Sequence, residues 1–508
     1  VNDAIMKAMS VKIEDRYQSA EEFQKALNRK KLSVKGTKKQ NVKLKQKKEK
    51  TKKTKTKSTS KKQRSRRVKI AIAVFWVVWI VSTIGTIKEG FMTPEAQKLP
   101  MPAENGEPIY IYSNDQNLEM FLQYIREKYP QYADLIKYKY IESSNTEYEL
   151  SVMQAIEEGG EQTPSIVTFE SPTAWNKLSS ESFVPVSEIG ITDSMYSNAY
   201  QYSIDYGTVD GKLKGMCYMV WPSCFVYRTD IAEKVLGSSD PKDVQKCIKD
   251  WDSFMDTAQK MKNAGYLMLP NTVDNTALIT AVLSERKGAL VQEDTFINTP
   301  LIDRYFTLTK RMYDNGYVPE DSRDAWTELN QWYSNSAEME AFGIYGGSWL
   351  NSVPYWDIDL AISGKINSCE GPVAYQSSMN YCLAVTNNCP NKELAALVLY
   401  TLCCDTDVMY KMGEETYAVV NNKKAEEMLI RDNKGYDASV GGENFLKACN
   451  TVAEKINGIQ ESQYDDSIKS YIVYLAKKYM KGEYSSSAEV VKELKTHIRN
   501  VYANMKVN

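Results

Sequence analysis

Residues 108–128 read PIYIYSNDQNLEMFLQYIREK and predict a strand, a polar loop and a helix in that order. The first six residues are rich in the β-branched and aromatic types that favour strands. After the loop, Leu118, Phe121, Leu122 and Ile125 fall on one face at helical spacing. A strand that leads directly into an amphipathic helix is the building unit of parallel α/β layers, so this stretch indicates an α/β fold.

The same alternation continues along the chain. The segment PSIVTFE (164–170) predicts another strand. Asp250 is placed to cap a helix that ends near Gly265, and Pro390 and Asn391 precede the apolar helical segment ELAALVLYTL. The apolar positions expected to face inward are Trp251, Phe254, Ala258 and Met261 in the first of these helices, and Val491, Leu494, Ile498 and Val501 in a last one. About 400 residues exceed one comfortable core, so two lobes with parallel α/β layers are expected.

Charge is distributed unevenly along the 508 residues, a length that allows two to four domains. Residues 29–67 contain 20 Lys/Arg and a single acid, Glu49, whereas the formal net charge of the whole chain is −1. The remainder is therefore acidic, with a formal net charge of about −20. A basic arm beside an acidic body argues against a protein that binds nucleic acid along its whole length.

Residues 70–87, IAIAVFWVVWIVSTIGTI, contain no charged side chain. As a helix they would reach about 27 Å, which is close to the hydrocarbon thickness of a bilayer. Arg64, Arg66, Arg67 and Lys69 precede the stretch. The positive-inside rule then places residues 1–69 in the cytoplasm and 88–508 outside the cell membrane. A cleaved signal peptide is the alternative, but the stretch is internal and has no clear small-x-small cleavage site.

Three further segments flank this single transmembrane helix. Residues 29–69 are predicted to be a disordered juxtamembrane linker whose lysines contact anionic lipid; a merely solvated linker is the alternative. Residues 88–107, with Pro94, Pro100 and Pro102, are expected to be a spacer before a globular domain of residues 108–508. Residues 1–28 are amphipathic, and because the chain begins at Val1 in the middle of a pattern, a longer protein is expected.

Histidine and cysteine chemistry limit the possible sites. The one histidine, His497, lies in a helix-period segment, so mechanisms with a histidine base or a pair of histidine metal ligands are nearly excluded. The nine cysteines all follow the hydrophobic stretch and include no CxxC pair, which argues against a zinc site. One or two disulfides remain possible, and no metal or cofactor is expected. No Walker loop, GxSxG or HExxH motif is present.

Several segments, in the expected order across residues 105–508, resemble the extracellular solute-binding proteins of carbohydrate ABC transporters. The first is the opening stretch through Tyr132, which ends in the Tyr-Pro after which the family's next strand starts. The others are PSIVTFESPTAWNKL, YGTVDGKLKGMCYMVWPSCFVYRTDIAEKVLG, WDSFMDTAQKMKNAGY and AEMEAFGIYGGSWL. The resemblance implies a two-lobed clamp, like a periplasmic binding protein, that closes on a solute.

The chain also departs from that family's pattern. Gly215-Met216-Cys217 replaces the usual glycine–x–proline turn, and Met339 lacks the usual preceding Gly-x-Ala. No lipid-attachment cysteine follows the hydrophobic stretch, which fits a true transmembrane anchor. These departures affect the hinge and the pocket rim rather than the fold.

A second resemblance covers the first 28 residues. AIMKAMSVKIEDRYQSAEEFQKAL is similar to the last helices of bacterial serine/threonine protein kinase domains, with Arg16 and Tyr17 carrying the match. The kinase glycine-rich loop, catalytic loop and magnesium-binding aspartate are absent from the chain. The resemblance implies a C-terminal remnant of a kinase-like domain; an ordinary amphipathic helix pair is the alternative.

Candidate ligand-binding residues follow from strand ends and from the family's cleft segments. Sugars need carboxylate and amide partners for hydroxyl groups and aromatic rings for their apolar faces. For each aromatic candidate, core packing is the alternative; for each polar one, a loop cap or a surface position. The candidates are Asn114, Asp115, Glu170, Trp175, Trp221, Tyr345, Ser348, Trp349 and Tyr381.

Three functions are consistent with these observations. The first is an anchored extracytoplasmic clamp that binds a carbohydrate or oligosaccharide and delivers it to an ABC-transporter permease. The second is the ligand-sensing ectodomain of a transmembrane serine/threonine receptor kinase. The third, a glycoside-processing enzyme, would use Glu170 and Asp115 as its acid pair, but nothing in the sequence supports the required spacing.

Overall fold

The structure is a computed structural model that describes residues 99–270, 276–320, 332, 340–348, 365–376 and 380–507. These residues belong to one compact unit of residues 97–508. The expected kinase-like remnant, basic linker and transmembrane segment lie outside the described residues. Within the described ranges, no helix combines the length and the apolar character needed to span a bilayer.

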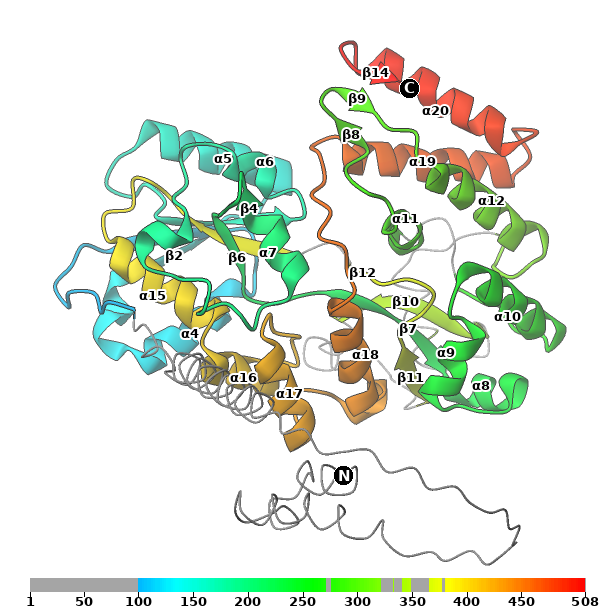
Figure 1. Ribbon diagram of the computed structural model, residues 1–508, viewed down its shortest axis with the longest axis horizontal. Helices are drawn as coiled ribbons and strands as arrows, with labels where there is room; N and C mark the ends of the chain where they lie inside the picture. The colour runs from blue at the N-terminus through cyan, green and yellow to red at the C-terminus, as the bar shows by residue number, and fades with distance from the viewer. Residues whose placement is uncertain are drawn as a thin grey trace, which may run out of the picture. The chain divides into compact units, whose positions relative to one another are not determined.

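A five-stranded sheet in the order β2-β1-β3-β13-β6 organises the first lobe (Figure 1). β1 (Ile109–Ser113) lies between β2 (Ile136–Tyr140) and β3 (Ile166–Ser171), and both pairings are parallel. β13 (Asn380–Val385) runs antiparallel to β3 and to β6 (Gly215–Cys217). The parallel half of this sheet confirms the strand–helix alternation expected from the sequence.

Helices cover both faces of this sheet. α4 and α15 pack on one face, where α4 buries Leu118, Phe121, Leu122 and Ile125, as its spacing predicts. α5 packs on the other face with its own apolar residues. The helices of this lobe are α4 (Leu118–Lys128), α5 (Asn145–Glu158), α6 (Trp175–Leu178), α7 (Gln201–Gly207), α15 (Lys392–Cys403), α16 (Thr406–Thr416) and α17 (Lys423–Asp432).

The second lobe is built on β7 (Pro222–Arg228), which is buried along its whole length. β10 (Gly343–Gly347) pairs with one side of β7, and β11 (Ile366–Cys369) and β12 (Tyr375–Gln376) pair with the other. All three pairings are antiparallel, so the expectation of parallel layers is wrong for this lobe. Its strands follow long excursions of the chain and return in the opposite direction.

In the described part of the chain, the second lobe also contains helices, some of which pack on one another rather than on the sheet (Figure 1). They are α8 (Thr229–Leu236), α9 (Pro241–Cys247), α10 (Trp251–Asn263), α11 (Thr276–Leu283), α12 (Pro300–Asp314), α18 (Glu443–Ala453), α19 (Asp465–Met480) and α20 (Ser487–Val501). The short strands are β4 (Thr208–Val209) paired with β5 (Lys212–Leu213), and β9 (Thr295–Phe296) between β8 (Val291–Gln292) and β14 (Lys506–Val507).

For two of these helices, α10 and α20, the sequence predicts which apolar residues face inward. In α10 the Asp250 side chain accepts a hydrogen bond from the Ser253 amide at 2.8 Å, and all four predicted apolar residues are buried. In α20, Leu494 and Ile498 are buried as predicted, but Val490 rather than Val491 continues the buried stripe. Val501, the last residue of the helix, is 54% exposed.

The chain passes between the lobes three times. It does so between β6 and β7, between β12 and β13, and between α17 and α18, the last of which packs against β7 and β11. The segment of residues 454–464 then joins α18 to α19, and it contacts the first lobe on its way: the Glu461 amide donates to the Pro172 carbonyl at 3.2 Å. This connector brings polar side chains between the two lobes.

Candidate functional site

A pocket lies between the two lobes and is lined by both of them. Glu170 and Thr173 reach it from the end of β3, Arg286 from the loop after α11, and Gln376 from β12. The connector and α19 complete its wall. Its cavity volume is about 70 Å³, well below the roughly 300–1,000 Å³ of typical small-molecule sites. The lobes as they stand therefore leave room for only a small part of a ligand.

A chain of hydrogen bonds brings Asn114 and Glu170 together at the first-lobe wall. The side-chain amide of Asn114 donates to Oδ1 of Asn145 at 2.5 Å, and Nδ2 of Asn145 donates to Oε2 of Glu170. Asn145 is the first residue of α5, whose preceding Ser144 forms a capping box with Glu147. The start of a capped helix thus positions the amide that orients the carboxylate of Glu170.

Tyr381 and Trp175 lie next to this carboxylate. Tyr381 is directly opposite Glu170 in the β13–β3 pairing, and burial together with the Asp115 and Glu170 charges raises the pKa of its hydroxyl. Nε1 of Trp175 donates to the Glu461 carbonyl of the connector at 2.7 Å. Four of the predicted residues, Asn114, Glu170, Trp175 and Tyr381, therefore share one edge of the first lobe.

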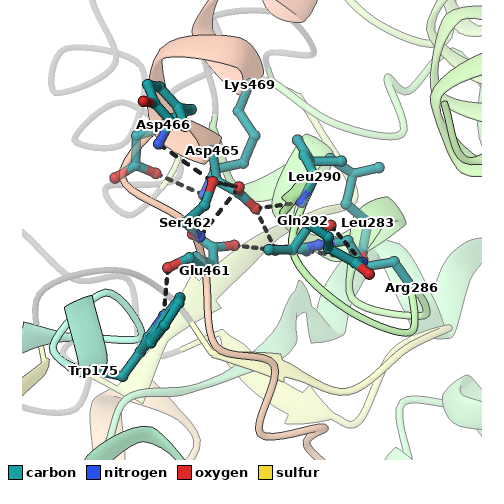
Figure 2. Close-up of polar contacts among 12 residues, drawn as sticks. Trp175, Leu283, Arg286, Leu290, Gln292, Glu461, Ser462, Asp465, Asp466 and Lys469 are labelled. Carbon is teal, nitrogen blue, oxygen red and sulfur yellow. Dashed lines mark hydrogen bonds and ion pairs between the residues drawn. The ribbon is translucent and has the colours of Figure 1, made fainter. Parts of the chain in front are cut away.

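On the second-lobe side, buried charges surround Glu461 (Figure 2). Its carboxylate accepts from Nη2 of Arg286 and, at 2.8 Å, from Nζ of Lys469. Arg286 also lies 3.4 Å from Asp465, and Lys469 lies 2.7 Å from Asp466. The side chains of Arg286 and Glu461 are 6% and 7% exposed, so this pair is shielded from water.

The electrostatics of the cluster follow from burial and from these neighbours. Burial alone would raise the pKa of Glu461, but the Lys469 and Arg286 charges outweigh it and lower that pKa. Burial and the nearby Glu461 charge raise the pKa of Asp465. Burial would lower the pKa of Lys469, but Glu461 and Asp466 raise it. Glu461 is therefore held ionised between two cations.

Some polar atoms in the pocket wall have unused hydrogen-bonding capacity. Nε of Arg286 and Oε1 of Gln376 are buried, and neither has a hydrogen-bond partner within the described part of the chain. Such groups cost free energy unless something else satisfies them. A ligand with hydroxyl groups could do so. The described ranges contain no group of three or more His, Cys, Asp or Glu side chains placed to hold a metal ion.

Among the described residues, Glu170 is the one predicted residue that lines this pocket, and Asp115, Ser348 and Trp221 lie elsewhere. Asp115 is 4% exposed; its carboxylate accepts from the Tyr218 hydroxyl and from the Asn117 amide at 2.9 Å, and burial raises its pKa. Oγ of Ser348 donates to the Val220 carbonyl at 3.0 Å. Trp221 packs at the margin of the first-lobe core.

Tyr345 is part of the aromatic core of the second lobe. Its ring contacts Phe225, Trp251, Phe254 and Tyr375, and it is 6% exposed. Trp349 lies outside the described residues. For Tyr345, the structure therefore supports core packing, which is the alternative to ligand contact for each aromatic candidate.

Four residues of the pocket wall were not predicted from the sequence: Arg286, Gln376, Glu461 and Lys469. Arg286 and Gln376 lie in stretches with no strand-end pattern. Glu461 precedes the run SQYDDS. In this run Asp465 begins α19, and its side chain accepts a hydrogen bond from the amide of Ser462, which lies before the helix. That polar run before a helix marks a helix start, but its sequence has no feature that would place it against the first lobe.

Known proteins share this architecture. The family model of the bacterial extracellular solute-binding proteins matches residues 125–428. The sugar-binding protein MalE from the phytopathogen Xanthomonas citri superposes with a TM-score of 0.61 at 13% identity, covering 78% of this chain and 97% of that one. No curated protein sequence matches the chain.

Two further solved structures are similar. One is the ABC transporter associated binding protein from B. animalis subsp. lactis Bl-04 in complex with β-1,6-galactobiose, with a TM-score of 0.55 and 17% identity over 80% of this chain and 100% of that one. The other is the cyclic α-maltosyl-1,6-maltose binding protein from Arthrobacter globiformis, with a TM-score of 0.58 and 12% identity over 78% and 99%. At such identities the likeness concerns the fold.

Proposed function

Because this chain belongs to the family of bacterial extracellular solute-binding proteins, we propose that it binds a carbohydrate between its two lobes for uptake by an ABC transporter. The observation that carries the proposal is the interlobe pocket, where Glu170 and the unsatisfied polar atoms of Arg286 and Gln376 face one another across the lobes. Hydroxyl groups can both donate and accept, so they suit such a mixed lining.

Proteins of similar fold support a sugar ligand, since one was solved in complex with β-1,6-galactobiose and another is a cyclic α-maltosyl-1,6-maltose binding protein. Trp349 is proposed to stack on a sugar ring from the GSW segment. Asp115, Trp221, Tyr345 and Ser348 are proposed to support the shape of the two lobes, in keeping with their burial or packing.

Calorimetric titration of the full chain in detergent micelles tests the proposal. The panel consists of α-linked glucose oligosaccharides and β-linked galactose disaccharides, with a tripeptide as a non-carbohydrate control. The expected result is saturable heat with one ligand per chain and an unchanged sugar after incubation. Heat with the tripeptide alone, or hydrolysis of the sugar, would contradict the proposal.

We propose that residues 70–87 anchor the domain in the cell membrane, with the basic linker of residues 29–69 in contact with anionic lipid on the cytoplasmic side. The uncharged stretch and its arginine-rich flank support this arrangement. Protease added to intact cells should digest an epitope at the C-terminus and spare one at the N-terminus. Protection of the C-terminal epitope in intact cells, with digestion after lysis, would refute it.

A second candidate function is that of a receptor, which the kinase-like residues 1–28 support. In that case ligand binding outside the cell would control a serine/threonine kinase inside it. The full-length gene distinguishes the two. A kinase lysine and catalytic-loop aspartate encoded upstream of Val1 would support the receptor function. Their absence would contradict it and favour the transport function.

A further inference from the structure

Four of the nine cysteines form two close pairs in the folded chain. Sγ of Cys217 lies 3.0 Å from Sγ of Cys382, and Sγ of Cys224 lies 3.5 Å from Sγ of Cys449. All four side chains are buried. The other five cysteines, which also fall in the described part of the chain, form no sulfur–sulfur hydrogen bond there.

The first pair lies within the first-lobe sheet. Cys217 is the last residue of β6, and Cys382 is directly opposite it on the antiparallel strand β13. Opposite residues of antiparallel strands have Cα atoms about 4.5–5.5 Å apart. Disulfides span Cα separations of about 4.4–6.8 Å. A bond between these two sulfur atoms is therefore compatible with the existing backbone.

The second pair joins the central strand of the second lobe to a helix. Cys224 is in β7 and Cys449 is in α18, which packs directly on that strand. Both residues are fully buried in a shared apolar cluster.

The positions of the two pairs relate to the passages between the lobes. Cys217 precedes the β6–β7 passage and Cys224 follows it, so each end of that passage has one pair. Cys382 is next to the first-lobe end of the β12–β13 passage, and Cys449 is in the helix that follows the α17–α18 passage. Each pair would therefore tie the ends of two different passages within one lobe.

We infer that Cys217 bonds to Cys382 and Cys224 bonds to Cys449, and that these two disulfides brace the lobe ends of the interlobe passages. Each bond forms when two thiols lose two protons and two electrons. The oxidant is a disulfide of the glutathione type or an oxidoreductase disulfide, which is itself reduced to two thiols. That this happens in the cell rests on the proposed extracytoplasmic location.

The timing of oxidation follows from the surroundings of the sulfur atoms. The contact with Cys217 and burial raise the pKa of Cys382, and burial and the contact with Cys224 raise the pKa of Cys449. Thiolates are the attacking species in disulfide exchange, so the folded, reduced chain reacts slowly. The bonds are therefore expected to form during folding.

A peptide map of the full chain tests the inference. The reduced chain is unfolded in urea and refolded in a buffer of oxidised and reduced glutathione; a second sample is the chain as isolated from aerated cells. Free thiols are alkylated under denaturing conditions before digestion without reductant. The expected result in both samples is two linked peptide pairs, one with Cys217 and Cys382 and one with Cys224 and Cys449, and five alkylated cysteines.

Thermal unfolding provides a second readout. Dithiothreitol is expected to lower the Tm of the oxidised chain by about 5 °C or more, because each bond closes a long loop. Cys217→Ser should make the decrease of Tm caused by dithiothreitol smaller, and Cys382→Ser should reduce it by the same amount. The matched control is Cys389→Ser, a buried cysteine outside both pairs, which should leave the shift unchanged and reduce the alkylated thiols from five to four.

Nine alkylated cysteines in the refolded sample, or linked peptides in other combinations, would overturn the inference. Linked peptides in the refolded sample but not in the chain from aerated cells would refute formation in the cell while leaving the pairing intact. Neither result bears on ligand binding, which the sugar titration measures separately.

Discussion

The carboxyl group of Glu426 is fully buried in the first turn of α17. Its Oε1 accepts a hydrogen bond from the Val420 amide at 2.7 Å, which fixes the loop before the helix. Burial raises the pKa of this group to about 8, from 4.5 for a free glutamate, although the Val420 amide acts in the opposite direction. The folded chain therefore keeps this proton at pH values where the unfolded chain has lost it.

This difference predicts that Glu426→Gln changes the pH dependence of stability. Between about pH 4.5 and 8 the native state binds the proton and the unfolded state does not, so wild-type stability falls as pH rises, by up to about 1.4 kcal/mol per pH unit. The glutamine variant has no such proton. We expect similar Tm values for both chains at pH 5 and a higher Tm for the variant at pH 8.

Thermal scans at both pH values measure this effect. The matched control is Glu427→Gln, which changes the exposed neighbouring glutamate and should follow the wild type at each pH. If the Glu426 and Glu427 variants behave alike, the buried carboxyl group does not contribute to the pH dependence.

Single residues show where sequence reasoning about the site succeeds and where it stops. Asn114 and Glu170 follow or end first-lobe strands, and the parallel pairing of β1 and β3 brings those strand ends together. Glu461 follows no strand and reaches the pocket only because its connector passes between the lobes. Its role depends on contacts with residues such as Arg286, which is 175 positions away in the sequence.

At the scale of elements, α10 is the clearest case of a helix whose limits can be predicted. Its N-cap Asp250 accepts a hydrogen bond from the Ser253 amide, and the chain leaves the helix before Gly265, which adopts a φ of 90°. We expect Asp250→Ala to lower the free energy of unfolding by about 1 kcal/mol, because an amide at the helix start loses its acceptor.

Urea unfolding followed by fluorescence measures that loss. Asp250→Asn is the matched control, since asparagine caps helices about as well as aspartate and should retain most of the stability. Equal losses in the alanine and asparagine variants would show that the charge, and not the cap, is what the site needs.

The direction of β7 and its partners could not be predicted in the same way. Alternating strand and helix patterns fit both parallel and antiparallel sheets once the connections are long, and β10 and β11 return to β7 only after long excursions. The local pattern identified elements such as α4 and α10, whereas tertiary packing determined the antiparallel order of the second-lobe sheet.

The connector of residues 454–464 contains Glu461, and removal of the charge of this residue should lower the free energy of unfolding strongly. Glu461→Gln leaves the buried Arg286 and Lys469 side chains without their shared carboxylate. Breaking a buried ion pair on one side typically costs several kcal/mol, so we expect a loss of about 3 kcal/mol in the free energy of unfolding. Urea unfolding at pH 7 measures it.

An exposed pair provides the comparison for this prediction. Glu443 and Lys447 form an ion pair on α18 with side chains that are 45% and 46% exposed. Glu443→Gln should change stability by no more than about 0.5 kcal/mol. A loss in the Glu461 variant as small as in the Glu443 variant would mean that solvent reaches the connector cluster.

At the scale of the whole molecule, the proposed function depends on how the two lobes share one pocket. A separate apolar cluster fills each lobe, a third contains buried residues of both lobes, and polar contacts of the connector add to the junction. The cavity of about 70 Å³ cannot hold a disaccharide as it stands. The proposed sugar could therefore enter only if the lobes separate, as in hinge closure around ligands in other two-domain proteins.

Glu170 provides the most direct test of sugar binding between the lobes. Its carboxylate lines the pocket and is oriented by Asn145 of the first lobe. A hydrogen bond from a ligand hydroxyl to a charged group contributes about 1.5–3 kcal/mol. Glu170→Gln should therefore weaken binding of the best sugar by about tenfold or more, while the Tm of the ligand-free chain stays within about 2 °C of the wild type.

Calorimetry with that sugar decides the matter, with Glu188→Gln as the control because Glu188 is an exposed glutamate of the same lobe outside the pocket. A lower affinity in both variants would indicate a general effect of surface charge. Unchanged affinity in the Glu170 variant would contradict the proposal that its carboxylate binds the sugar in this pocket, because the charged hydrogen bond expected there would then be absent.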